Sequence, residues 1–232
     1  MTSINICKKM HLGTRGDVWT MLGGAKIYAP LYPWDYIQRI IVDSDNFFEL
    51  DILSACAPYI PANATILDAG ANIGNHSLFW ATECGAKKIH AFEPVATSYD
   101  CLVKNIALNN LQGVIIPYDF ALGHKSDRAK IKKNYGDNIG MTSLAESPAG
   151  KIQIRRYDEL DIASEHIDFA KIDVEGFELK ALAGMREMLA RDRPPVLIET
   201  FADDYAAVKS FFDGLDYTRA AKFEDSNYLF VP

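Results

Sequence analysis

Acidic side chains occur at the ends of several apolar, strand-like segments of this 232-residue sequence. Asp68 and Glu93 lie at the ends of "TILD" and "KIHAFE", and Asp173 and Glu175 follow "IDFAKI". Carboxylates beside a sheet core are costly unless they are paired or used. They can hold a cation, accept hydrogen bonds from hydroxyl groups or remove a proton. The sequence therefore indicates a site for a ligand that is cationic, rich in hydroxyls, or both.

The elements that must position these acids alternate along the chain. Apolar strands are predicted at residues 65–69, 88–94, 113–122, 167–173 and 194–200. Helices are predicted at residues 72–84, 97–110, 177–190 and 203–215, and residues 216–223 and 226–232 form a closing antiparallel pair. Alternating strands and helices favour an α/β fold with a mostly parallel sheet. Ligands bind such sheets outside the carboxyl ends of the strands, where the acids fall.

Other regions give weaker signals. Residues 1–45 mix glycine and proline with aromatic residues, which predicts short strands and turns. A helix is expected after Asn46, which is a plausible N-cap. Residues 128–134 and 151–157 resemble polar-faced strands on either side of a flexible segment, 135–150.

The turn after the first strand contains Gly70, Asn72 and Gly74. Glycine allows a sharp turn and a close approach of a ligand or helix. The spacing G-x-x-x-G differs from the G-x-G-x-x-G of dinucleotide folds, and Asp68 would repel a pyrophosphate. A binding loop and a purely structural turn both remain open for this motif alone.

Glu93 lies about twenty residues beyond the glycines, where an acid in these folds binds both ribose hydroxyls. Alternatively, Glu93 and Pro94 only begin the next helix. Asp119 and Phe120 end the third strand and could bind an adenine, or form an ordinary strand end with an outward carboxylate. The glycine turn and Glu93, at the separation expected for these folds, are together a stronger signal than either alone.

Asp173, Glu175 and Glu178 crowd the end of the fourth strand, and Glu199 follows the fifth. Helix-dipole complementarity explains Glu178 best, whereas Asp173 indicates function. His76 could act as a general base or could simply pack at a helix N-terminus. Asp173, Glu175 and Glu199 could hold a divalent cation, but no His-carboxylate spacing supports this, so no metal is predicted.

Composition narrows the function classes. The formal net charge of −7 argues against nonspecific binding to nucleic acid. The four cysteines are scattered, without metal-site spacing, and are expected to be free thiols. No segment has the apolar length of a membrane span, and the start does not read as a signal peptide. A soluble, cytoplasmic protein is expected, and self-association into a homo-oligomer is left open.

The combined motifs resemble the FkbM family of S-adenosylmethionine-dependent methyltransferases. The resemblance extends in order over residues 65–200 and rests on the stretches "ILDAGANIGNHSLFWA", "HAFEPVATSYDCLVKNIALNN", "DFALG", "DFAKIDVEGFELKALAGM" and "VLIET". It implies a Rossmann-like class I methyltransferase fold, with a seven-stranded sheet whose last strand is antiparallel. It also implies O-methylation of a hydroxyl on a sugar, glycan or small natural product.

The resemblance also implies residue roles. Gly70, Asn72 and Gly74 would shape the loop under the methionine part of S-adenosylmethionine, with Asn75 beside them. Glu93 and Pro94 would lie at the ribose, and Asp119 and Phe120 at the adenine. Asp68 and Asp173 would face the cationic groups, with Asp173, Glu175 and His76 as catalytic candidates. Residues 1–45 would form a substrate-side extension, and 46–232 the methyltransferase domain.

The sequence leaves three alternative functions to weigh against methyl transfer. A nicotinamide-dependent oxidoreductase is disfavoured by the missing third glycine and the acidic residues. A nucleic-acid base methyltransferase would be expected to carry an Asn/Asp-Pro-Pro-aromatic motif where this chain has "DVEG". A non-catalytic cofactor-binding protein stays open, and turnover on acceptors would distinguish it from an enzyme.

Overall fold

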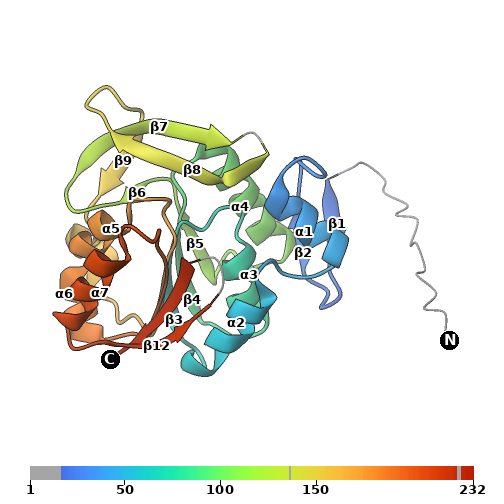
Figure 1. Ribbon diagram of the computed structural model, residues 1–232. Helices are drawn as coiled ribbons and strands as arrows, with labels where there is room; N and C mark the ends of the chain where they lie inside the picture. Colours follow the sequence, from blue (N-terminus) through green and yellow to red (C-terminus); the bar gives the residue numbers. More distant parts are fainter. Residues whose placement is uncertain (1–16, 136, 224–225) are drawn as a thin grey trace.

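A seven-stranded sheet forms the centre of the computed structural model, which describes residues 17–135, 137–223 and 226–232 (Figure 1). The strand order is β12-β13-β11-β10-β3-β4-β5. The strands are β3 (Thr65–Ala69), β4 (Lys88–Phe92), β5 (Ile115–Tyr118), β10 (Phe169–Ile172), β11 (Val196–Glu199), β12 (Thr218–Lys222) and β13 (Asn227–Val231). Neighbours pair in parallel except at β13, which is antiparallel to both β11 and β12. The predicted sheet is confirmed, including its antiparallel last strand.

Helices cover both faces of this sheet. Figure 1 shows α3 (Asn75–Thr82) and α4 (Ala96–Leu108) on one side, and α5 (Glu178–Gly184), α6 (Arg186–Asp192) and α7 (Tyr205–Asp213) on the other. Alternate strand residues face opposite cores: Ile66 packs with Trp80 and Leu102, whereas Leu67 packs with Leu182. This period of two is what a sheet buried on both faces requires. The helix expected over residues 177–190 is divided into α5 and α6.

A second sheet, with strand order β6-β9-β7-β8, lies across one end of the first (Figure 1). Its strands are β6 (Ala121–Leu122), β7 (Asp127–Tyr135), β8 (Asn138–Glu146) and β9 (Ile152–Arg155). The expectation of a flexible segment over residues 135–150 is therefore wrong for most of its length. β8 pairs along β7, with Ile131 opposite Leu144, and Thr142 is buried. The irregular register of this pair weakens the period-two signal in the sequence.

The N-terminal region packs on the same core as the main sheet. It contains β1 (Val18–Thr20), β2 (Lys26–Tyr28), α1 (Tyr36–Ser44) and α2 (Leu50–Cys56). Ile27 and Ile41 are fully buried, and the amide of Tyr28 donates to Asn105 Oδ1 on α4. The strands expected here are present, within the part that the structure describes.

Two smaller features concern α2 and the thiols. The helix begins at Leu50 rather than directly after Asn46, because Glu49 adopts a left-handed conformation with φ of 56°. Cys56, Cys84 and Cys101 are free, whereas Cys7 lies outside the described residues. Within those residues, no helix has the length and apolar character needed to cross a membrane.

Candidate active site

A cavity of about 610 Å³ opens at the carboxyl ends of the central strands. β8 and the first residues of α1 form its opposite wall, so the second sheet covers this end of the first. The lining includes most of the predicted site residues: Gly70, Asn72, Asn75, His76, Glu93, Pro94, Phe120, Asp173, Glu175 and Glu199. Asp68, Gly74 and Asp119 do not line it. The topology thus brings together residues that are more than 120 positions apart in sequence.

The glycine turn that follows β3 packs against the backbone at the end of β10. Gly70 has a φ of 82°, and a Cβ atom there would lie 1.7 Å from the carbonyl oxygen of Asp173. Gly74 has a φ of 90°, and a Cβ atom there would lie 2.7 Å from Leu102 Cδ1. Both glycines are therefore required by backbone conformation and by close packing. Between them, Asn72 lines the cavity and its buried Oδ1 atom has no hydrogen-bond partner.

Glu93 joins this turn to the start of α4. Its Oε2 atom accepts a hydrogen bond from the amide of Asn72 at 2.9 Å, and Oε1 accepts one from Val95 at 2.7 Å. The side chain is only 6% exposed but lines the cavity. Burial raises the pKa of Glu93 to about 7, although the two amides and Lys171 favour its ionised form. The helix-start and ribose-binding interpretations are compatible, because each carboxylate oxygen can accept a second hydrogen bond.

Lys171 is a buried cation that the sequence did not single out. Its Nζ atom donates to the Gly70 carbonyl at 2.7 Å and lies 3.0 Å from Asp173 Oδ2 and 3.6 Å from Asp68 Oδ1. Burial disfavours the charged ammonium, but Asp173 and Asp68 outweigh it and raise the pKa of Lys171. A lysine inside a central parallel strand, buried on both faces, is the signal that could have revealed it.

Asp68 therefore lies beneath the cavity floor. It is fully buried, and its Oδ2 atom accepts a hydrogen bond from Ser77 Oγ at 2.6 Å. Its other oxygen faces Lys171. In this position Asp68 neutralises the lysine that supports the glycine turn, and direct contact with a ligand stays a prediction.

Asp173, Glu175 and Glu199 form a compact group, in which one carboxylate oxygen from each residue lies within 4.8 Å of the other two. Burial opposes ionisation of Asp173, but Lys171 and a hydrogen bond from Glu199 hold its pKa below the usual value. Burial and the neighbouring Asp173 raise the pKa of Glu199 to about 10. Asp173 is therefore the ionised member and Glu199 the protonated one at neutral pH. The hydrogen bond from protonated Glu199 to Asp173 allows these two carboxyl groups to lie close together. That the site works without a metal stays a prediction.

Glu175 has two unusual properties. Burial, followed by repulsion from Asp173 and Glu178, raises its pKa to about 8. Its backbone is left-handed with φ of 52°, and Gly176 follows at 88°. A non-glycine residue in this region costs about 1–3 kcal/mol and is often found at functional sites. A strained turn that presents a carboxyl group with a pKa near neutrality is suited to proton transfer.

His76 and Asn75 begin α3 and both line the cavity. His76 Nε2 lies 3.1 Å from Glu49 Oε2, without the alignment of a hydrogen bond. Asn75 is used structurally, because its side chain exchanges hydrogen bonds with the amide and carbonyl of Phe48, each at 3.0 Å. Asn75 thereby holds the segment before α2 against α3. Contact between Asn75 and a cofactor stays a prediction.

The segment that follows β5 contributes Phe120, Ala121 and Leu122 to the lining. Phe120 is 6% exposed and packs its ring 5.5 Å from that of Phe92, with Pro94 also in the lining. Asp119 is exposed and does not line the cavity. The apolar face predicted for a planar base is therefore present, whereas its predicted polar partner is not in the lining.

Several lining residues have no counterpart in the sequence predictions. Glu49, Tyr36, Met141 and Phe201 contribute to the lining from segments outside the strand-turn-helix pattern. No spacing rule connects these segments, since loops and a second sheet bring them together. The arrangement as a whole combines an apolar pocket, a group able to accept a proton, and carboxylates suited to cationic and hydroxyl groups.

Comparison with known proteins agrees with this geometry. A family model for the methyltransferase FkbM domain matches residues 68–224. Methyltransferase sdnD from Sordaria araneosa is 30% identical over 165 residues, which cover 55% of this chain and 62% of that relative. Hexuronic acid methyltransferase AglP from Haloferax volcanii is 25% identical, over 73% of this chain and 70% of that protein. The chain thus spans less than two thirds of the length of the Sordaria protein.

Solved structures share the fold. The crystal structure of methyltransferase FkbM from Methylobacillus flagellatus superposes with a TM-score of 0.55 at 21% identity, covering 73% of this chain and 44% of that one. The tRNA m1G37 methyltransferase of M. jannaschii gives a TM-score of 0.51 at 14% identity, over 92% of this chain and 52% of that one. These likenesses show a Rossmann-like fold. Together with the family match over most of the chain, they show that this protein belongs to the FkbM family of methyltransferases.

Proposed function

We propose that this protein transfers a methyl group from S-adenosylmethionine to a hydroxyl of a sugar or natural-product acceptor. The observation that carries the proposal is the carboxyl-rich lining of the cavity. It holds Glu93, Asp173, Glu175 and Glu199, whereas Lys171 is its sole lysine or arginine within the described residues. S-adenosylmethionine carries an ammonium, a sulfonium and two ribose hydroxyls, all of which suit carboxylates.

Different residues of the cavity would bind different groups of S-adenosylmethionine. Glu93 would accept the ribose hydroxyls with the lone pairs that its two backbone contacts leave free. Asn72 Oδ1, which is buried without a partner, offers an acceptor to the donor's ammonium group. Asp173, kept ionised by Lys171, would stabilise positive charge nearby. Phe120 and Phe92 supply the apolar surface that an adenine needs.

When bound, S-adenosylmethionine supplies a methyl carbon already activated by its sulfonium. The chain must then align an acceptor oxygen and remove its proton. Alignment within the cavity can supply several kcal/mol. Glu175, which lines the cavity and has a raised pKa, would take the proton from the acceptor hydroxyl. A base whose pKa lies near the working pH is the most effective in this role.

The acceptor side of the cavity is proposed to be formed by the N-terminal region and β8. Tyr36, Ile37 and Ile40 of α1 line the cavity opposite the central sheet, together with Ile139 and Met141 of β8. This supports the prediction of a substrate-side extension for the described residues 17–45. The division of the chain at residue 45 is itself a proposal, because both parts share one core.

Calorimetry with three ligands tests the donor. S-adenosylmethionine and S-adenosylhomocysteine are expected to bind, and NAD is not, because its pyrophosphate would meet acids rather than free cations. Binding of NAD alone would favour an oxidoreductase. A screen with radiolabelled donor over sugars, lipid-linked sugars and small hydroxyl compounds then tests turnover. Donor binding without transfer to any acceptor would support a non-catalytic protein.

A further inference from the structure

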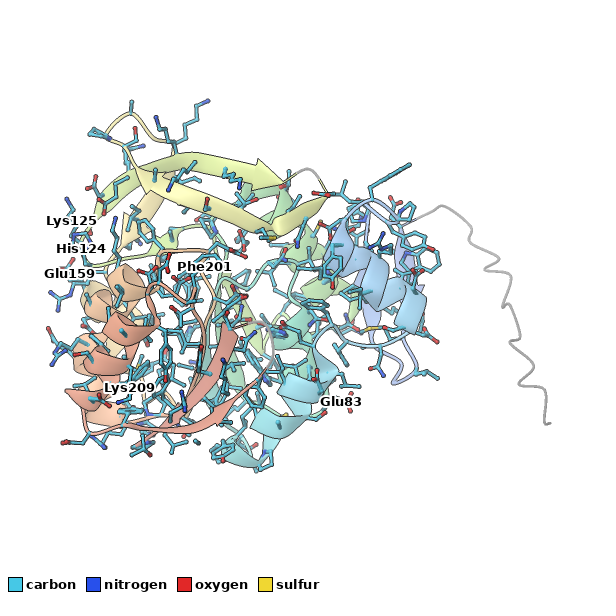
Figure 2. All side chains as sticks on the ribbon, viewed as in Figure 1. Glu83, His124, Lys125, Glu159, Phe201 and Lys209 are labelled. Atoms are coloured by element: carbon cyan, nitrogen blue, oxygen red, sulfur yellow. The ribbon has the colours of Figure 1, made fainter. Side chains whose placement is uncertain are left out.

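The mouth of the cavity is apolar and is formed by three separate elements. Tyr36 at the start of α1, Met141 of β8 and Phe201 after β11 all line the cavity. They are nevertheless 44%, 37% and 47% exposed, respectively. In Figure 2, Phe201 is labelled below the second sheet. These three residues, the apolar rim, present partly exposed aromatic and aliphatic surface, although the Tyr36 ring also contacts Phe48 edge-on and has the Arg39 guanidinium 5.9 Å from its centroid.

Two of the three elements that form the rim, α1 and β8, are held together by hydrogen bonds. Asp35 is 1% exposed, and its two oxygens accept hydrogen bonds from the amides of Gln38 and Ile139, both at 2.9 Å. The amide of Tyr36 donates to the Asp137 carbonyl at 2.7 Å. The first turn of α1 and the start of β8 are therefore fixed to each other. A rim fixed before binding loses little freedom on binding, which favours affinity.

Beneath the rim, the cavity lacks an available cation. Its lining carries six carboxyl residues: Glu49, Asp51, Glu93, Asp173, Glu175 and Glu199. Lys171, the one lysine or arginine of the described lining, is 4% exposed and already contacts Gly70, Asp68 and Asp173. His76 lies beside Glu49. A carboxylate on the acceptor would find no unpaired lysine or arginine in the described lining, and the ionised Asp173 would repel it.

We propose, building on the methyl transfer proposed above, that the acceptor is an uncharged hydroxyl compound with a ring whose apolar face packs on Tyr36, Met141 and Phe201. The same cavity discriminates against uronic acids. The Haloferax relative is named as a hexuronic acid methyltransferase, so this chain would differ from it in acceptor charge. Sugar rings have an apolar face of C–H groups that packs well on aromatic rings.

Two matched ligands test whether the cavity prefers a neutral acceptor to an anionic one. Phenyl β-D-glucopyranoside and phenyl β-D-glucuronide differ only in the group at C6, which is neutral in the first and anionic in the second. Each is titrated by ligand-observed NMR into protein saturated with S-adenosylhomocysteine. The glucoside is expected to bind about tenfold or more tightly than the glucuronide, because of like-charge repulsion. Equal or tighter binding of the glucuronide, or no binding of either ring, would overturn the inference.

Variants test the rim. Tyr36→Ala and Phe201→Ala are each expected to weaken binding of the phenyl glucoside by about threefold to tenfold, the range for an aromatic contact. Trp34→Ala is the matched control, because Trp34 is 77% exposed and does not line the cavity. Unchanged binding in both rim variants would overturn the inference.

Calorimetry of S-adenosylhomocysteine with the same proteins separates the two proposals. Its affinity is expected to be the same in wild type and rim variants. Failure of the wild-type protein to bind it would overturn the proposed function and, with it, the inference. Normal binding of S-adenosylhomocysteine, without a preference for the phenyl glucoside over the glucuronide, would overturn only the inference.

Discussion

At the scale of single residues, the buried Lys171 organises the cavity floor. It links the turn after β3 to the end of β10 through the Gly70 carbonyl and through two carboxylates. One ammonium thus compensates Asp68 and Asp173, which would otherwise be two uncompensated negative charges beside the core. A buried ion pair contributes little net stability, but removing one partner leaves the other charge isolated.

Lys171→Met is therefore expected to lower the free energy of unfolding by about 3–5 kcal/mol, measured by urea denaturation at neutral pH. Lys209→Met is the control, since Lys209 forms an exposed i,i+4 pair with Asp213 on α7, labelled in Figure 2. That variant should change stability by less than about 0.5 kcal/mol. A similar small effect of both substitutions would show that Lys171 does not compensate the buried acids.

Glu93 serves the fold and, in our proposal, the donor. Glu93→Ala is expected to weaken S-adenosylhomocysteine binding by roughly 1.5–3 kcal/mol, the range for hydrogen bonds to a charged group. It should also destabilise the protein by about 1–3 kcal/mol, because the amides of Asn72 and Val95 lose their acceptor. Calorimetry and urea denaturation measure the two effects. Unaltered ligand affinity in the folded variant would restrict Glu93 to joining the two loops.

Glu175 is the residue on which the proposed chemistry depends. Glu175→Gln keeps the side-chain shape and removes the basic carboxylate, so turnover is expected to fall by about two orders of magnitude. Donor affinity should stay close to wild type, whereas Asp173→Asn should weaken both. Initial rates on the acceptor found in the screen, with calorimetry of the donor, provide the measurements. If turnover is fully retained, His76 becomes the next candidate base.

At the scale of elements, Asp35 connects α1 to β8. It caps the helix through Gln38 and accepts the amide of Ile139 with its second oxygen. The rim of the cavity therefore depends on a residue that does not line it. This is a positioning function, because Asp35 acts through the two elements it holds.

Asp35→Ala should destabilise the protein by about 1–3 kcal/mol, from loss of the helix cap and of the second hydrogen bond. Asp35→Asn, which retains one acceptor oxygen, should lose less. Asp43→Ala, an exposed acid on the same helix, should stay within about 0.5 kcal/mol of wild type. Thermal or urea denaturation ranks the three variants, and equal stability of the alanine variants at positions 35 and 43 would contradict the argument.

The sequence predicts elements well where one physical rule dominates. Apolar strands alternating with amphipathic helices specify the main sheet, and the acids after β4 and β10 are placed correctly at the cavity. Asp68 shows the limit of that reasoning, since its spacing matched a ligand site but its side chain is directed to Lys171 and Ser77. β8 was missed because its pairing with β7 is irregular, and Tyr36 and Phe201 because only tertiary packing joins their segments.

At the scale of the whole molecule, the protein carries a formal net charge of −7 and concentrates carboxyl groups at one cavity. Burial and mutual repulsion keep Glu175 and Glu199 protonated at pH values where free carboxyl groups are ionised. A raised folded-state pKa means that the folded protein binds more protons than the unfolded chain over this interval. Stability must therefore fall as pH rises through it.

Glu199→Gln tests this linkage. The pKa of Glu199 is raised from 4.5 to about 10, so its stabilising contribution is present below pH 4.5 and lost progressively up to pH 10. Wild type should lose stability between pH 6 and pH 9 with a slope of up to about 1.4 kcal/mol per unit for this group. The neutral amide of the variant should reduce that slope. Glu159→Gln, an exposed control labelled in Figure 2, should leave the slope unchanged.

The position of β13 has a consequence for how the protein is made. A ribosome synthesises β11 before β13, yet β13 lies between β11 and β12 in the finished sheet. Until residues 227–231 have emerged, the hydrogen-bonding edge at Val196–Glu199 has no partner. Open edges of apolar strands recruit other chains, so the nascent protein is prone to aggregation until these residues have emerged. A chain truncated before Asn227 would lack β13, so this edge of β11 would stay open.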